Sequence, residues 1–312
     1  MFYTFQRRGG PYAPTGAGLG GLPNIDTDVP ICAVFIFLYL LFGIVNIIIF
    51  RQNLRKHHKF PISVVLVVFC YARIVTLVLR IAWATRQQNI RLAIAAEILL
   101  NAGILIVYIV NLILAQRILR AKQPQIGWNP IIRIVYKLLY VGIGMALVAV
   151  ITSVVTSLYT LNMHTRSDCR DVELAALTYL IIFTCLPVVH IIAIVILPRS
   201  QQEESFGEGS MTSKLIIVTL STCLCILIAG FKAGVIWSPA RSALNPAWFD
   251  SKACLYVFGF TMEILVLFLL TFARIDKRFF VPNGCKQAGD YNRLGKQTPV
   301  ENEEVWPSSS KS

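Results

Sequence analysis

The sequence has few of the residues that soluble enzymes and metal proteins rely on. Only 14% of its 312 residues are charged, against roughly 25% in soluble domains. It contains 16 acidic residues and four histidines, and no cysteines or histidines stand at a recognised zinc spacing. The sequence therefore predicts no metal site, no cofactor and no enzyme.

Apolar residues make up 56% of the chain and are gathered in blocks. The mean hydropathy of the chain is +0.65. Seven blocks are long enough to cross a hydrocarbon core of about 30 Å as helices. We expect an all-α, polytopic membrane protein whose seven-helix transmembrane domain covers 31–280. A flexible, extracellular N-terminal tail is expected over 1–30 and a disordered cytoplasmic tail over 281–312. The predicted spans are 31–50, 61–84, 92–116, 136–160, 174–197, 214–236 and 253–273.

The net charge of +13 follows the topology of the chain. Lysine and arginine are concentrated in the first, third and fifth loops between spans and in the C-terminal tail. By the positive-inside rule these segments are cytoplasmic and the N-terminus lies outside. The basic balance thus predicts an integral, multi-pass protein whose partner is the lipid bilayer. It does not indicate nucleic acid.

Charged and amide side chains occur inside the predicted spans, where lipid offers them no partner. The second span carries Arg73 and Arg80, two helical turns apart. A stripe of side chains on one face of the third span, spaced by three and four residues, is mostly polar and must face the bundle interior. The stripe consists of Glu97, Asn101, Ile104, Tyr108 and Asn111.

Depth suggests how these charges pair. The short loop between the second and third spans makes them antiparallel neighbours, so Arg80 can meet Glu97 near the outer surface and hold the helix register. Arg73 and Glu263, in the last span, lie at a similar depth. They are expected to form either a structural pair or a functional polar centre. Lys232, near the outer end of its span, is expected to extend towards the interface.

Three further residues are open to more than one interpretation. His190 follows Pro187 and is either a packed polar residue beside a kink or a proton site. Cys169 and Cys254 lie in two outer loops and either form a disulfide or remain unpaired.

Two function classes remain. The last span has no deep lysine for retinal, and two arginines do not make a voltage sensor. One class is a receptor that takes a small-molecule or lipid ligand and contacts a cytoplasmic signalling partner. The other is a transporter or lipid-translocating protein that uses the same polar centre.

Three runs resemble a family of fungal membrane proteins. They are RIVTLVLRIAWATRQQNIRLAIAAEILLNAG, LILAQRILRAKQPQIGWNP, and ACLYVFGF with ARIDKRFFVPNG. They are similar to an uncharacterised seven-span family of filamentous fungi, whose members are often labelled family C-like G-protein-coupled receptors. The resemblance implies a seven-span fold and a receptor-like protein. A more distant similarity to fungal lipid-translocating exporters implies the alternative.

Overall fold

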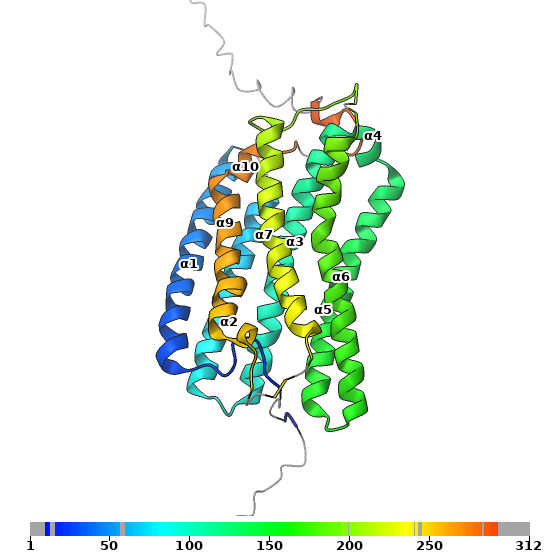
Figure 1. Cartoon of the computed structure of the whole chain (residues 1–312). Helices are drawn as coiled ribbons and strands as arrows, with labels where there is room; N and C mark the ends of the chain where they lie inside the picture. Colours follow the sequence, from blue (N-terminus) through cyan, green and yellow to red (C-terminus); the bar gives the residue numbers. More distant parts are fainter. Residues whose placement is uncertain are drawn as a thin grey trace, which may run out of the picture.

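Seven long apolar helices dominate the computed structural model, which describes residues 10–12, 16–56, 60–198, 200–239, 241–242, 245–282 and 284–292 (Figure 1). Their length and composition confirm the predicted all-α, multi-pass membrane fold. The first six spanning helices are α1 (Ile25–Arg55), α2 (Pro61–Thr85), α3 (Ile90–Lys122), α5 (Pro130–Tyr159), α6 (Met163–Ile196) and α7 (Met211–Trp237). The seventh span, Lys252–Phe272, joins α8 (Lys252–Cys254), the π-helical η2 (Leu255–Thr261) and α9 (Met262–Phe272). Short helices are α4 (Pro124–Gly127), η1 (Trp248–Asp250) and α10 (Ile275–Arg278).

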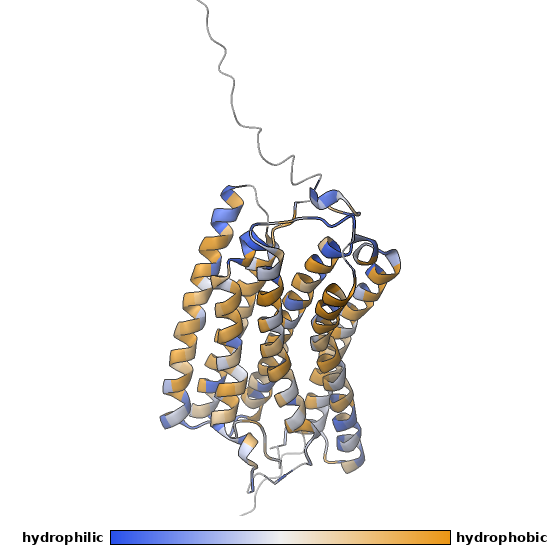
Figure 2. Ribbon diagram, turned by 45° about the horizontal axis from the view of Figure 1, so that its top comes forward, coloured by the Kyte–Doolittle hydropathy of each residue, from blue (hydrophilic) through white to orange (hydrophobic). Residues whose placement is uncertain are grey.

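Polar caps decide where several helices begin. The side chains of Asn24, Asn129, Asn162 and Ser210 each accept a hydrogen bond from a backbone N–H in the first turn. Hydropathy alone misses such ends, and α1 begins at Ile25 rather than at the predicted residue 31. Polar residues gather at the helix ends, whereas the long faces of the helices are apolar (Figure 2).

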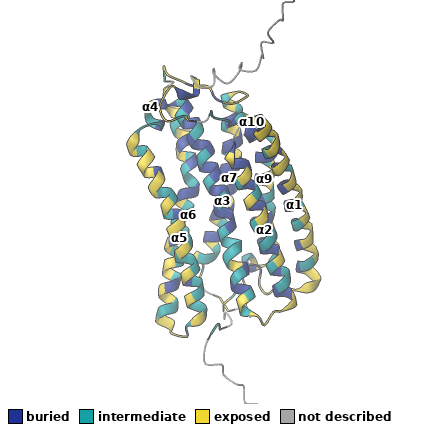
Figure 3. Cartoon of the chain, turned by 180° about the vertical axis from the view of Figure 1, so that it is seen from behind, coloured by how far each residue is buried: buried dark blue, intermediate teal, exposed yellow. Residues whose placement is uncertain are grey.

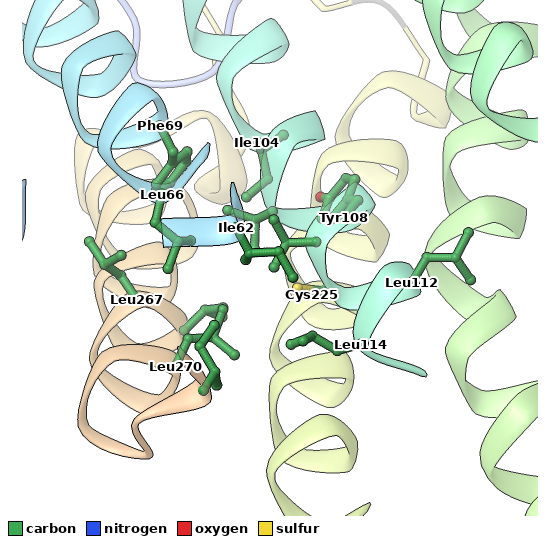
Figure 4. Packing of buried hydrophobic residues seen from close by; sticks show 14 of the residues in the cluster. Ile62, Leu66, Phe69, Ile104, Tyr108, Leu112, Leu114, Cys225, Leu267 and Leu270 are labelled. Atoms are coloured by element: carbon green, nitrogen blue, oxygen red, sulfur yellow. The ribbon is translucent and has the colours of Figure 1, made fainter. Parts of the chain in front are cut away.

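Helix α3 occupies the centre of the bundle and packs against α2, α5, α6 and α7. Helix α1 packs on α2 and α9, while α5 packs on α6 at the opposite side. Burial follows this plan, because α3 is largely buried and α1 and α5 expose apolar faces (Figure 3). Side chains from α2, α3, α7 and α9 form the central core (Figure 4). The exposed apolar faces suit a surrounding bilayer.

The end of the bundle that carries residues 16–24 is termed the N-terminal end and lies at the bottom of Figure 1. Here the backbone N–H of Ala17 donates to the carbonyl of Arg241 at 2.9 Å, and that of Gly20 donates to Asp250 at 2.9 Å. Residues 16–24, expected in a flexible tail, therefore pack across the helix ends. Their fixed contacts close part of this end.

The opposite, C-terminal end carries α4, α10 and residues 284–292. The Glu204 carboxylate accepts hydrogen bonds from the backbone N–H groups of Gly289 and Tyr291 at 2.8 and 2.9 Å. These residues belong to the predicted disordered tail 281–312, so its first part lies on the bundle. At the same end Asp276 accepts from Asn53 at 3.1 Å and pairs with Arg274 at 2.9 Å. Burial raises the pKa of Asp276, but the hydrogen bonds from these two residues outweigh it and hold this pKa below its ordinary value.

Candidate functional site

Arg73 and Glu263 form a fully buried ion pair in the middle of the bundle. Nη2 of Arg73 lies 2.5 Å from Oε1 of Glu263, and the two side chains are 0% and 1% exposed. The prediction that they lie at the same depth is confirmed. Tyr39 on α1 donates to Oε2 of Glu263 at 3.1 Å, so the pair ties three spans together.

The surroundings of Arg73 are shaped to hold a guanidinium. Nη1 donates to the carbonyls of Leu99 and Leu100 at 3.3 and 3.0 Å, and a ring of Phe69 lies 5.5 Å from Cζ. Gly103 on α3 leaves the necessary room, because a Cβ there would lie 2.9 Å from Nη1. The ion pair is thus surrounded by side chains and backbone carbonyls of the neighbouring helices.

Arg80 does not pair with Glu97, and that prediction is wrong. Its Nη2 lies 2.9 Å from Oδ1 of Asp28 in the first turn of α1, and its Nε lies 3.0 Å from the same oxygen. Asp28 is fully buried and also binds Lys252 at 2.5 Å and the hydroxyl of Tyr256 at 2.6 Å. Arg80 therefore joins α2 to α1 and the seventh span.

Sequence reasoning missed Asp28 because residues 1–30 were assigned to a tail. An available signal was the Asn24 cap followed by acidic residues in a first turn, which together predict an earlier helix start. The carbonyl of Gly20 accepts from Nη2 of Arg80 at 3.0 Å. The packed N-terminal segment thus takes part in the same network.

A pocket of about 460 Å³ opens at the N-terminal end between α3, α5, α6 and α7. Residues 16–19 line its outer part. A narrower cavity of about 60 Å³ adjoins it deeper in the bundle. Asn101, Glu173 and Lys232 line both spaces, while the deeper cavity is walled mainly by aliphatic side chains. Together they form what we term the interhelical pocket.

Two carboxylates in this pocket make no hydrogen bond or ion pair in the described structure, although Arg80 acts on Glu97 and Arg170 acts on Glu173 at longer range. Glu97 of α3 and Glu173 of α6 line the pocket and interact electrostatically with each other. Among the described residues neither carboxylate accepts a hydrogen bond or lies within ion-pair distance of a cation. Membrane spans rarely carry an ionisable group without a partner or a task. Glu97 thus belongs to the pocket rather than to the arginine network.

Lys232 connects the pocket with the buried ion pair. Its Nζ donates to the carbonyl of Leu100 at 3.2 Å, and the same carbonyl accepts from Arg73 at 3.0 Å. Lys232 is buried and points inward, so the expectation that it extends to the interface is wrong. A change at Lys232 can therefore reach Arg73 through one shared acceptor.

The remaining predicted residues divide between the pocket and the packed core. Asn101 lines the pocket, and the buried hydroxyl of Tyr108 faces the deeper cavity without a hydrogen-bond partner among the described residues. Asn111 donates to Thr222 at 3.2 Å. His190 hydrogen-bonds to Tyr136 through Nε2, and its Nδ1 lies 2.7 Å from the carbonyl oxygen of Leu186.

Of the two alternatives for Cys169 and Cys254, the structure shows the unpaired one. Cys169 lies on α6 and Cys254 on α8, and both are free thiols. The sulfur of Cys254 lies 3.5 Å from the carbonyl oxygen of Trp248. Cys32 is also free, and its sulfur lies 3.3 Å from the hydroxyl of Tyr256.

Comparison with known proteins gives one match. A family described as "Protein of unknown function (DUF3112)" matches residues 205–280, which cover α7 and the seventh span. No curated protein and no solved structure matches the chain.

Proposed function

We propose that this multi-pass membrane protein is a receptor-like protein that binds a small molecule in the interhelical pocket. The observation that carries the proposal is that Glu97 and Glu173, in a pocket open at one end, make no hydrogen bond or ion pair with any described residue. Glu97 is exposed to the pocket and Glu173 is half-buried, so both carboxylates are accessible to a bound ligand. Binding sites between bundle helices commonly combine apolar walls with a few polar groups.

The packing towards the C-terminal end favours a receptor over a transporter. Beyond Tyr108, hydrogen bonds join Asn111 to Thr222, and Gln116 to Tyr140 at 2.9 Å. These contacts connect α3 with α7 and α5. A pocket that ends against such contacts suits ligand binding better than passage through the bundle. The resemblance to receptor-labelled seven-span proteins of fungi agrees with this proposal.

The link through Leu100 supplies a path from ligand to helix position. A ligand that displaces Lys232 from the carbonyl of Leu100 leaves that carbonyl to Arg73 alone. Arg73 in turn fixes α2 against the seventh span through Glu263. Differential binding of this kind is what shifts a conformational equilibrium.

The test is a thermal-shift screen of purified protein in lipid nanodiscs against amines, carboxylic acids and lipids. Ala146 lines the deeper cavity, and Ala146→Leu partly fills it. Ala175 on α6 is exposed, so Ala175→Leu is the matched control. We expect compounds that raise the melting temperature of the native protein and of Ala175→Leu but not of Ala146→Leu. A screen without any such compound would refute the pocket.

A second measurement separates the two classes. The protein is reconstituted into sealed vesicles, and movement of a radiolabelled hit compound across the membrane is followed. We expect binding without net movement. Movement that is abolished by Ala146→Leu would establish transport and contradict the receptor proposal.

A further inference from the structure

We infer that the interhelical pocket selects an organic cation, with an ammonium group held between Glu97 and Glu173 and an apolar body reaching towards Tyr108. This inference rests on the proposed ligand pocket and adds the charge and class of the ligand. It follows from which polar groups of the pocket are already satisfied by the protein and which are not.

The cationic side chains of the pocket already have acceptors. Arg166 donates to the carbonyls of Ser157 and Thr160 at 3.2 and 2.9 Å, and Arg170 donates to Ser238 at 2.9 Å. Lys232 donates to Leu100, and Arg241 lies over the ring of Phe249. An anionic ligand would have to compete with these contacts.

The two carboxylates of the pocket, unlike its cationic side chains, have no hydrogen-bond partner among the described residues. Glu97 and Glu173 repel each other, while Arg80 and Arg170 act on them only from beyond ion-pair distance. A cation placed between the two carboxylates would attract both of them and so offset their mutual repulsion. The missing component of the pocket is therefore a positively charged hydrogen-bond donor, such as a protonated amine.

The deeper cavity indicates that this cation is organic. The described residues contain no group of three or more side chains that could hold a metal ion. The cavity beyond the carboxylates is walled mainly by apolar side chains such as Leu105, Ala146 and Leu177. The hydroxyl of Tyr108, which is buried and lacks a partner among the described residues, offers one polar contact to the far part of a ligand. An amine with an aromatic or alkyl body matches the order of carboxylates, apolar walls and hydroxyl along the pocket.

The experiment measures saturable binding of tritiated phenethylamine to the full chain in nanodiscs, with 3-phenylpropionate as a carboxylate of similar shape. We expect the Kd to rise at least tenfold in Glu97→Gln and in Glu173→Gln. Glu208 is exposed at the C-terminal end, and Glu208→Gln should change the Kd less than twofold. Unlabelled phenethylamine should compete, whereas 3-phenylpropionate should not. Tyr108→Phe should weaken binding about threefold, and the melting temperature of each variant checks its folding.

The outcomes distinguish this inference from the proposed function. Competition by 3-phenylpropionate, or equal Kd values in the native protein and both glutamate variants, overturns the cation site. If phenethylamine does not bind but binding of another compound from the screen is lost in Ala146→Leu, the pocket stands and the inferred charge preference is wrong. If no compound of any charge depends on Ala146, both the inference and the proposed function fail.

Discussion

Removing the charge of Glu263 should strongly destabilise the protein. In Glu263→Gln, the guanidinium of Arg73 stays buried without its counter-ion. The carbonyls of Leu99 and Leu100 remain as acceptors, but they carry no net charge. Breaking a buried pair by removing one partner costs about 3–5 kcal/mol, so a loss of this size is expected.

The double variant Arg73→Met with Glu263→Leu should recover most of that loss. Both charges are then absent, and replacing a buried ion pair with apolar groups is often neutral. Tyr39 loses one acceptor but keeps the carbonyl of Phe260 at 3.4 Å. The two single changes are therefore strongly non-additive, with a coupling energy of about 2 kcal/mol or more.

The free energy of unfolding is measured by steric trapping in mixed micelles for the native protein, Glu263→Gln, the single variants Arg73→Met and Glu263→Leu, and their double variant. Arg86 is exposed at the end of α2, and Arg86→Met is the control for loss of an arginine. The reasoning is refuted if Glu263→Gln costs less than about 1 kcal/mol, or if the double variant costs the sum of the singles.

Three further changes test other contacts. In Gly103→Ala the new Cβ would lie 2.9 Å from a guanidinium nitrogen of Arg73, so the protein should lose about 1–3 kcal/mol of stability. Gly144 has open space around it, so Gly144→Ala should cost nothing. Thermal melts compare the two variants. Asp28→Asn leaves two cationic side chains without a counter-ion and should lower the melting temperature well below that of the exposed control Asp26→Asn. Because hydrogen bonds hold the pKa of Asp276 low despite its burial, its stabilisation is present at neutral pH and is lost as the pH falls below about 4. Asp276→Asn should therefore be less stable than the native protein at pH 7, and this difference should shrink in unfolding titrations below pH 4.

The seven-span fold could be predicted because each span is determined by the length and hydropathy of a single continuous segment. Helix ends depend on a few polar caps, and these lie outside the apolar runs. Asn24 therefore begins α1 at Ile25, in a segment that composition assigned to a tail. For the same reason the contacts of residues 284–292 with Glu204 could not be foreseen, since they join segments far apart in the chain.

The charge pairs show where prediction from depth succeeds and where it stops. The rise per residue is constant along a helix, so Arg73 and Glu263 could be matched in depth without knowledge of the packing. The partner of Arg80 depended on which helix end packs beside it, and Asp28 lies closer than Glu97. Glu173 was not identified because it stands at the edge of a predicted span, where a charge needs no explanation.

The paired and unpaired charges lie in different halves of the bundle. Ion pairs join α1, α2 and the seventh span through Asp28 and Glu263, whereas the unpartnered carboxylates lie on α3 and α6, facing α5 and α7. Rearranging the first half requires breaking buried pairs, while filling the pocket requires none. Under the proposed function, helices α5, α6 and α7 are thus the part that a ligand would move at low cost. Because Leu100 of α3 accepts from both Lys232 and Arg73, such a movement would change the environment of the buried pair without opening it.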